Sequence, residues 1–328
     1  MKAIVYAEYG PPEVLSLSEI ERPAPGPGEV LIRIRAASVN PIDWHFMRGI
    51  PYAMRLQSGL RRPKSGRLGY DMAGTVEAAG QGAARFNAGD GVFGSCRGAF
   101  AEYACASENT VVHKPANVTF EQAAAVPVAA LSALQALRDK GRIRPGLKVL
   151  INGASGGVGT FAVQLARVYG AEVTGVCSSR NVDMVRSIGA DRVVDYTRED
   201  FTRAGLRYDL ILDTVGNHSL SDRRRALTAD GILVLVGGSE TGRLLGPMAG
   251  MLKAVALSPL VKQKLLPFLA RVNRDDLLAL KELLGAGRVT PVIDRTYPLG
   301  DVPQAIRHLE GGHARGKIVI TIPGHGEA

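Results

Sequence analysis

The sequence contains little of what would mark a secreted, fibrous or membrane-spanning protein. Only three cysteines occur in 328 residues, too few for a disulfide framework, which favours free thiols in a reducing compartment. The longest stretch without Asp, Glu, Lys or Arg, Val149–Ala166, is interrupted by Gly, Ser, Asn and Gln and does not suit a bilayer helix. The amino terminus, MKAIVYAEYG, lacks the apolar segment of a secretory signal. These absences predict a cytoplasmic protein whose mature chain starts at Met1.

Low-complexity and collagen-like compositions are excluded as well. Glycine is enriched at 39 residues, but glycine and the 18 prolines together stay below the low-complexity range. Hydrophobic residues make up 46% and charged residues 22%, which suffices for a full core, and the length suggests two domains. The net charge of +9 is compatible with nucleic acid, an anionic membrane surface or an anionic small molecule as a partner.

The chain changes its pattern near residue 123. Residues 1–122 consist of short β segments separated by Pro-Gly and Gly-Asp-Gly turns, which predicts a β-rich, partly barrel-like domain. Over residues 123–262 strands alternate with helices, which predicts right-handed βαβ units and a doubly wound parallel sheet, a Rossmann domain. Residues 263–328 regain β character and are expected to return to the first domain. The predicted fold class is therefore α/β.

The strongest local signal is a glycine-rich turn between a predicted strand and a helix. It comprises Ala154, Ser155, Gly156, Gly157, Val158 and Gly159. A dinucleotide-binding fold needs small residues here, because the chain turns tightly and the pyrophosphate binds at the helix N-terminus. Ala154 replaces the first glycine of the usual fingerprint, while strand, helix and second strand stand where the fingerprint requires them. The alternative is a glycine-rich turn of another α/β fold.

Residues after the second strand of this domain bear on the choice of nucleotide. A carboxylate there would hold the ribose 2′-hydroxyl of NAD, whereas this chain has Ser178, Ser179 and Arg180. Two hydroxyls and a guanidinium suit a 2′-phosphate, which predicts NADPH; the alternative is a solvated turn without a ligand. Gly237, Gly238 and Ser239 follow a later strand, at the sheet edge where such folds bind ligands, and are candidates for backbone contacts to the nicotinamide.

Six ordered motifs resemble the medium-chain dehydrogenase/reductase superfamily, specifically its zinc-free quinone oxidoreductase, or ζ-crystallin-like, branch. They are Ala36–Asp43, Gly69–Val76, Phe86–Val92, Ala154–Gly159, Asp213–Gly216 and Gly316–Ile320. Cys177–Arg180 adds a resemblance to the mitochondrial reticulon-interacting reductases. The resemblance covers the whole chain. It implies a GroES-like first domain, and a homodimer in which the apolar segment Met251–Leu269 contributes a dimer edge or covers the active site.

The same resemblance bears on metal binding. In zinc-dependent relatives a cysteine stands at the position of Asn40, and a Gly-His-Glu run stands at Gly69–Asp71. Neither Asn40 nor Tyr70 is a zinc ligand, and a catalytic zinc needs three Cys, His or carboxylate ligands. The sequence therefore predicts no metal. Without one, the simplest chemistry is hydride transfer from NADPH to an electron-poor acceptor, a quinone or an α,β-unsaturated carbonyl.

The resemblance also implies which side chains line the nicotinamide pocket. Asn40 matches a residue beside nicotinamide and substrate, and Tyr52 matches a pocket tyrosine that could donate a proton or hydrogen bond to a developing enolate. Ser132 stands where relatives usually have threonine. Tyr196 matches a tyrosine that packs against the adenosine phosphate. The alternatives are structural: a turn residue at Asn40, helix packing at Ser132 and packing at a strand exit for Tyr196.

Residues 53–68 contain basic but no acidic side chains. The basic residues are Arg55, Arg61, Arg62, Lys64 and Arg67. Such a run is typical of a solvated loop, and the alternative is a docking site for a CoA or carrier-protein thioester, which would make the protein an enoyl-thioester reductase. The loop has no aromatic residues, so nucleic acid is poorly supported. A further alternative is a non-catalytic NADPH-binding or RNA-binding ζ-crystallin-like protein. Lys317, before the last strand, is expected to be merely exposed.

Overall fold

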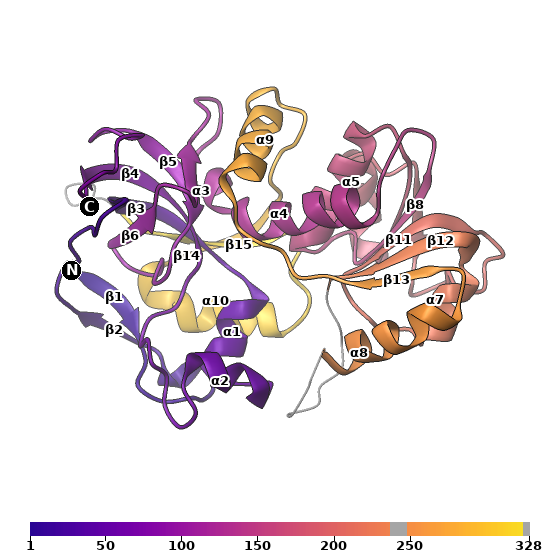
Figure 1. Cartoon of the computed structure of the whole chain (residues 1–328), viewed down its shortest axis with the longest axis horizontal. Coiled ribbons are helices and arrows are strands. Elements are labelled where there is room, and N and C mark those ends of the chain that lie inside the picture. The colour runs from indigo at the N-terminus through magenta and orange to yellow at the C-terminus, as the bar shows by residue number, and fades with distance from the viewer. Residues whose placement is uncertain (237–247, 324–328) are drawn as a thin grey trace. The chain divides into compact units, whose positions relative to one another are not determined.

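Two large sheets organise the chain, each in a unit of its own (Figure 1). The computed structural model describes residues 1–236 and 248–323. One unit combines Met1–Leu131 with the carboxy-terminal segment from Val272, and the other is Ser132–Arg271. The prediction of an α/β chain with a Rossmann-like parallel sheet and a β-rich domain is confirmed.

The first unit is built on a sheet in the order β14-β15-β3-β4-β5-β7, with β6 also paired to β3. Its strands are β3 (Glu29–Val39), β4 (Asp71–Ala79), β5 (Gly91–Ser95), β6 (Tyr103–Ser107), β7 (Val111–His113), β14 (Ile293–Pro298) and β15 (Lys317–Thr321), beside a small sheet of β1 (Lys2–Val5) and β2 (Ser16–Glu19). Its helices are α1 (Pro41–Arg48), α2 (Arg55–Ser58), α3 (Phe120–Ala124), α9 (Arg274–Gly285) and α10 (Val302–Glu310), and α4 (Pro127–Gln135) continues into the second unit.

The carboxy-terminal strand β15 belongs to the sheet of the first unit. It runs antiparallel to β3, with Ile318 opposite Val39 and Ile320 opposite Ala37. The alternating apolar residues of β15 join β3 and α10 in one buried core. This register brings Lys317, at the start of β15, to the end of β3.

The second unit is a six-stranded parallel sheet in the order β10-β9-β8-β11-β12-β13. The strands are β8 (Lys148–Asn152), β9 (Glu172–Cys177), β10 (Arg192–Asp195), β11 (Tyr208–Asp213), β12 (Leu227–Leu235) and β13 (Lys264–Pro267), and the helices are α5 (Gly157–Val168), α6 (Val182–Ser187), α7 (Leu220–Arg225) and α8 (Met248–Leu257). In Figure 1, α5 lies on one face of the sheet and α7 and α8 lie on the other. Strand order reverses between β8 and β11, which is the position where open α/β sheets bind ligands.

The apolar segment Met251–Leu269 contains most of α8 and all of β13. Strand β13 extends the sheet by pairing in parallel with β12, from Ile232 opposite Lys264 to Leu235 opposite Pro267. None of the helices within residues 1–236 and 248–323 is long and apolar enough to cross a membrane.

Candidate functional site

The glycine-rich turn connects β8 to α5 at the switch point of the sheet. The backbone N–H groups of Gly153 and Ala154 donate to the carbonyl of Val176, at 3.2 and 3.0 Å. Gly153 has φ of +86°, which favours glycine. A Cβ at Gly159 would lie 2.0 Å from the carbonyl oxygen of Gly153, so only glycine lets α5 approach the turn so closely. The backbone therefore fits a pyrophosphate at the start of α5.

The turn leaves its central residues accessible. Ala154 and Gly159 are buried, whereas Ser155, Gly156, Gly157 and Val158 are partly exposed. A Cβ on Gly156 would meet only the carbonyl oxygen of Gly153, at 3.4 Å. The turn is thus open at the position of Gly156, where a phosphate could approach the backbone.

Asn181, which sequence patterns do not single out, connects the turn to the end of β9. Its Nδ2 donates to Oγ of Ser155 at 3.1 Å and to Oγ of Ser178 at 3.2 Å. The residue is 5% exposed, and its Oδ1 has no hydrogen-bond partner within the described residues. Asn181 therefore orients two of the predicted cofactor-binding serines from below the surface.

The residues predicted to hold a 2′-phosphate lie at the ends of two neighbouring strands. Ser178, Ser179 and Arg180 follow β9, and Tyr196 follows β10, where its backbone N–H donates to the carbonyl of Cys177 at 3.0 Å. Ser179 and Arg180 are exposed, and Tyr196 is 52% exposed. The parallel register of β9 and β10 thus brings the four residues to one accessible edge.

A carboxylate also lies at this edge, although none follows β9 in the sequence. Asp195, at the end of β10, accepts a hydrogen bond from Oγ of Ser179 at 2.5 Å. The backbone N–H and Oγ1 of Thr197 donate to its other oxygen, at 3.0 and 2.8 Å. The hydrogen bond from Ser179, together with those from Thr197, lowers the pKa of Asp195. A negative charge therefore borders the predicted phosphate site, and the hydroxyl hydrogen of Ser179 is already donated to it.

A buried ion pair stabilises the ends of β8 and β11 beside the turn. Asp213, 0% exposed, accepts from Nη1 of Arg223 at 2.6 Å and from Nδ2 of Asn152 at 2.9 Å. The backbone N–H groups of Val215 and Gly216 also donate to it, at 3.0 and 2.9 Å. Within the Asp213–Gly216 motif, the carboxylate of Asp213 thus accepts from the backbone that follows it and stabilises a turn at the carboxyl end of β11.

The remaining cofactor candidates and Ser132 add less. Gly237, Gly238 and Ser239 lie outside the described residues. Ser132 belongs to α4, at the start of the second unit, and is 7% exposed. The roles predicted for these four residues stay predictions.

In the first unit, strand pairing gathers Asn40, Asp71 and Lys317 at the end of β3. Ser38 lies opposite Asp71 across β3 and β4, and Ile318 lies opposite Val39 across β15 and β3. Asn40 follows β3, so its side chain meets the first residue of each neighbouring strand. All three side chains are buried, with exposures of 2%, 0% and 3%.

These side chains form one hydrogen-bonded network. Nζ of Lys317 donates to Oδ1 of Asn40 at 2.6 Å and lies 3.4 Å from Oδ2 of Asp71. Nδ2 of Asn40 donates to the same Asp71 oxygen at 2.9 Å, and Oγ of Ser38 does so at 3.1 Å. The backbone N–H of Val128 donates to the other Asp71 oxygen at 3.0 Å. Burial raises the pKa of Asp71, and the charge of Lys317 together with the donors Asn40, Val128 and Ser38 opposes that rise. Every contact to Asp71 comes from a donor, which favours the ionised carboxylate.

The prediction that Lys317 is exposed is wrong. Burial lowers the pKa of its ammonium group, and the carboxylates of Asp71 and Asp43 oppose that effect. Tertiary pairing, which the local sequence does not reveal, removes this lysine from water. Asn40, predicted to orient the substrate, has both ends of its amide hydrogen-bonded to this network.

A second buried carboxylate lies next to the network. Asp43, in the first turn of α1, accepts from the backbone N–H of Asn40 at 2.8 Å and of Gly69 at 3.1 Å. It therefore joins the start of α1 to the segment that leads into β4. Burial raises its pKa to about 7, with the charge of Asp71 adding to the rise and the backbone donors opposing it.

Tyr52 has a different environment. It begins a 3₁₀ turn, Tyr52–Met54, and is 40% exposed. The guanidinium carbon of Arg55 lies 4.7 Å from the centroid of its ring and 4.5 Å from that of Tyr9. Arg55 thus lies near both aromatic rings, and Tyr52 stays partly accessible.

The resemblance aligns Asn40 and Tyr70 with zinc ligands of zinc-dependent relatives, and in this structure these positions have other surroundings. Asn40 and Asp71 surround an ammonium group, and Tyr70 replaces the histidine. Within residues 1–236 and 248–323, no three His, Cys, Asp or Glu side chains come together as metal ligands. A catalytic zinc requires three such ligands.

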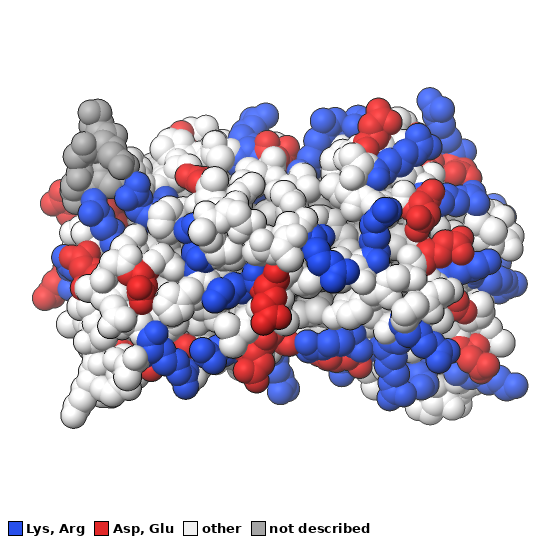
Figure 2. Space-filling model, turned by 90° about the horizontal axis from the view of Figure 1, so that it is seen from above, with Lys and Arg blue, Asp and Glu red and all other residues white. Residues whose placement is uncertain are grey.

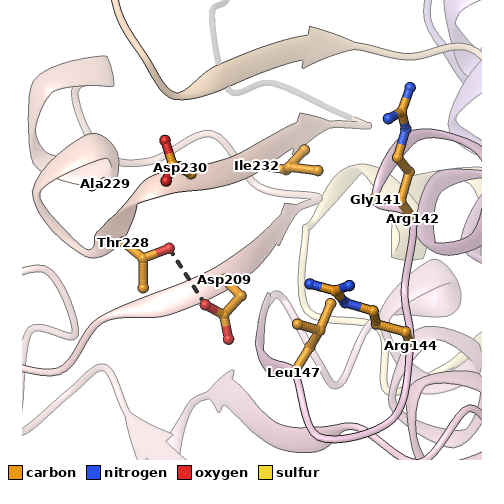
Figure 3. A pocket seen from close by; sticks show the side chains of 9 residues that line it. All are labelled: Gly141, Arg142, Arg144, Leu147, Asp209, Thr228, Ala229, Asp230 and Ile232. Atoms are coloured by element: carbon orange, nitrogen blue, oxygen red, sulfur yellow. Dashed lines mark hydrogen bonds between the residues drawn. The ribbon is translucent and has the colours of Figure 1, made fainter.

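A hollow of about 620 Å³ lies in the second unit, at the amino ends of the strands, whereas the glycine-rich turn lies at their carboxyl ends. Figure 3 shows Arg142 and Arg144 extending from the segment before β8, and Asp209 and Asp230 from the first halves of β11 and β12. Because ligands of open α/β sheets bind at the carboxyl ends of strands, the hollow is not part of the candidate site.

Known proteins match the chain over both units. Residues 26–116 match the alcohol dehydrogenase GroES-like domain, and residues 188–320 match the zinc-binding dehydrogenase family. The mitochondrial NAD(P)H oxidoreductase RTN4IP1 of Mus musculus is 36% identical, over 98% of this chain and 89% of that protein. The chloroplastic quinone-oxidoreductase homolog of Spinacia oleracea is 35% identical, over 98% of both chains.

Solved structures show the same similarity. The quinone oxidoreductase from Coxiella burnetii superposes with a TM-score of 0.84 at 33% identity, covering 98% of this chain and 99% of that one. The Escherichia coli quinone oxidoreductase complexed with NADPH superposes with a TM-score of 0.82 at 26% identity, covering 98% of this chain and 100% of that one. The similarity therefore extends over both units and their order along the chain.

Proposed function

The chain belongs to the quinone oxidoreductase branch of the medium-chain dehydrogenase/reductase superfamily, and on that premise we propose that it is an NADPH-dependent, zinc-independent reductase of quinones or α,β-unsaturated carbonyls. Membership makes it an NAD(P)H-dependent oxidoreductase. The observation that carries the proposal is the glycine-rich turn at the switch point, beside the accessible group of Ser178, Arg180 and Tyr196.

The preference for NADPH rests on Arg180, whose planar guanidinium suits a phosphate. Ser178 and Tyr196 border the same edge, whereas the Ser179 hydroxyl is engaged by Asp195. Arg180→Ala should raise the dissociation constant of NADPH far more than that of NADH, measured by fluorescence titration. Arg203→Ala, which removes another exposed cation of the second unit, is the matched control. Equal losses for both nucleotides in Arg180→Ala would remove it from the phosphate site.

When bound, NADPH supplies the hydride, and the chain orients the acceptor and stabilises the charge that develops on its oxygen. Tyr52 is the accessible donor among the three catalytic candidates, Asn40, Tyr52 and Ser132. Its phenol would hydrogen-bond to the acceptor oxygen and donate a proton to an enolate. Tyr52→Phe should therefore lower kcat for an enone by about 10²-fold while the dissociation constant of NADPH stays unchanged. An unaltered kcat would exclude this role.

Zinc independence is supported by the donor set around Asn40 and Asp71, which contains an ammonium group and too few metal ligands. Turnover should persist after incubation with phenanthroline and dialysis. Loss of activity, restored by added zinc, would overturn this part of the proposal.

The acceptor is tested by following the oxidation of NADPH and NADH with benzoquinone, phenanthrenequinone, an alkenal and crotonyl-CoA in parallel. Turnover of the quinones or the alkenal is the expected result. Turnover of crotonyl-CoA alone would favour an enoyl-thioester reductase. Binding of NADPH without any turnover would favour the non-catalytic alternative.

The enoyl-thioester alternative has one observation in its favour. Arg61, Arg62 and Lys64 are exposed in the segment that follows Tyr52, where they would attract the phosphates of CoA. The triple change to glutamine should then raise KM for crotonyl-CoA but not for benzoquinone, and neutralising Lys140, Arg142 and Arg144 is the matched control.

On the face shown in Figure 2, basic and acidic side chains are interspersed and form no continuous basic field for nucleic acid.

A homodimer is proposed from the free edge of the second sheet. Strand β13 pairs with β12 alone among the described strands, and Leu252, Val255 and Leu260 nearby are 55%, 56% and 79% exposed. Pairing of two such edges would bury both. Light scattering at micromolar concentration should give twice the chain mass; the monomer mass would exclude the dimer. A cytoplasmic location is proposed as well. The named relatives are mitochondrial or chloroplastic, so cell fractionation is the experiment that tests this location.

A further inference from the structure

Among the described residues of the first unit, Lys317 is the most deeply buried cation. The hydride transfer proposed above does not use it. Its residue exposure is 3%, and its partner Asp71 is 0% exposed. Placing an ammonium group there has a large desolvation cost, so its retention needs a reason. The surroundings of its nitrogen supply one.

We infer that Lys317 is a resident cation that fills the buried position between Asn40 and Asp71 and thereby fixes the orientation of the Asn40 amide. Lys317 is in this sense a positioning residue, because it acts through Asn40, the residue predicted from the sequence to orient the acceptor. The consequence for catalysis rests on the proposed function, whereas the occupancy of the position by a cation does not.

The ammonium group is fully supplied with oxygen acceptors. Oδ1 of Asn40 lies 2.6 Å from Nζ, the carbonyl of Val39 3.3 Å and Oδ2 of Asp71 3.4 Å. An ammonium group has three N–H donors, and here each has an oxygen to bind. Lys317 therefore behaves as a cation enclosed by oxygen ligands that come from two strands and the residue after one of them.

The chemistry of its neighbours permits only one orientation of Asn40. An ammonium group can only donate hydrogen bonds, and an ionised carboxylate can only accept them. Asn40 therefore turns Oδ1 toward Lys317 and Nδ2 toward Asp71. The flipped amide would oppose two donors at Lys317 and two acceptors at Asp71. Nδ2 also donates to the carbonyl of Ser38 at 3.4 Å, so removal of the cation would leave Oδ1 without its Lys317 donor while Asp71 and Ser38 still accept from Nδ2.

The same arrangement accounts for the mismatch with zinc-dependent relatives. The position of Asn40 corresponds to a cysteine ligand in those proteins, and Asp71 lies beside the position of their histidine. In this chain a positive charge already belongs to the polypeptide and satisfies Asp71. A divalent ion would have to displace Lys317 from all three oxygens.

The direct test replaces the cation from solution. Lys317→Ala removes the ammonium group and leaves space, which ethylammonium can fill with the same three donors. We expect ethylammonium to raise the melting temperature of Lys317→Ala saturably, relative to sodium chloride at equal ionic strength. Tetramethylammonium, which has no N–H donor, should have no such effect. No response to ethylammonium is expected from the wild type or from Lys317→Met. The control Lys148→Ala, in which an exposed lysine is removed, should not respond either. A Lys317→Ala variant that does not respond, or a wild type that responds equally, would overturn the inference.

A second variant keeps the test decisive if Lys317→Ala does not fold. Lys317→Met combined with Asp71→Asn removes both charges, so its melting temperature should return toward that of the wild type. Its kcat with benzoquinone should nevertheless stay about 10- to 100-fold low, because nothing holds the Asn40 oxygen, while the dissociation constant of NADPH is unchanged. Recovery of both melting temperature and kcat would show that Lys317 only balances charge, against the inference.

Failure of the proposed function and failure of the inference on Lys317 give different experimental results. If the wild type turns over none of the acceptors, the proposed function fails, and the ethylammonium effect on melting temperature still decides whether Lys317 is a resident cation. If the wild type is active but the melting temperature of Lys317→Ala is insensitive to ethylammonium, the inference fails and the proposed function stands.

Discussion

Two polar clusters of this protein use similar groups and differ in their access to water. At the end of β3, Asp71 is paired with Lys317, and their side chains are 0% and 4% exposed. At the end of β10, Asp195 lies 3.5 Å from Arg198, and these side chains are 14% and 81% exposed. In both clusters the carboxylate accepts several hydrogen bonds.

The difference in exposure assigns the two clusters different tasks. In the buried cluster each charge depends on its partner, because water cannot replace a lost contact. In the exposed cluster water and salt compensate for any single loss, so that charges there can be exchanged with little effect on folding. The buried cluster therefore serves a fixed geometry, and the exposed one suits the selection of a ligand.

The largest effect is expected from deleting the carboxylate of the buried cluster. Asp71→Ala leaves Lys317 buried without its counter-charge and should lower the free energy of unfolding by about 3–5 kcal/mol, measured by urea denaturation. Asp195→Ala, the same change in the exposed cluster, should alter stability little. Equal losses for both variants would remove the distinction between the clusters.

The buried ion pair of Asp213 and Arg223 lies in the second unit. It therefore tests whether burial, and not location in the first unit, makes a charged group necessary for stability. Arg223→Met removes the cation from Asp213, which keeps donors from Asn152, Val215 and Gly216. We expect a loss of about 2–3 kcal/mol in the free energy of unfolding. Arg225→Met, on the same helix but paired with the accessible Asp222, should have little effect. A larger loss for Arg225→Met would contradict the role assigned to burial.

The glycine-rich turn allows folding and ligand binding to be separated. Gly159→Ala places a Cβ against the carbonyl of Gly153 and should lower the free energy of unfolding by about 1–3 kcal/mol. Gly156→Ala meets no close atom and should leave stability unchanged, yet weaken NADPH binding, because its methyl group enters the phosphate path. Calorimetry and fluorescence titration of both variants test this. Unaltered NADPH binding by Gly156→Ala would place the phosphates elsewhere.

The smallest effect is expected in the exposed cluster. Asp195→Asn removes a negative charge beside Arg180 and should improve NADPH binding a few-fold relative to NADH, more at low salt than at high salt. The ratio of the two dissociation constants, measured at two ionic strengths, tests this. A ratio that does not change with the substitution would separate Asp195 from the nucleotide edge.

Local sequence predicted those parts of the candidate site that depend on neighbours along the chain. The turn Ala154–Gly159 was predictable because tight turns need small residues wherever they occur. Ser178–Arg180 was predictable because it directly follows a strand. Asp195 and Asn181 were not, since the former reaches Ser179 through the pairing of β9 and β10 and the latter through a side-chain contact across a turn.

The sequence by itself determined the α/β class and the glycine-rich turn, because hydrophobic periodicity and backbone freedom are local properties. Tertiary structure alone decided that Lys317 is buried and that both ends of the Asn40 amide are engaged. Those contacts join residues 277 positions apart. Only the antiparallel register of β15 on β3 brings them together, and the exclusion of water there converts an ordinary lysine into a fixed partner of Asp71.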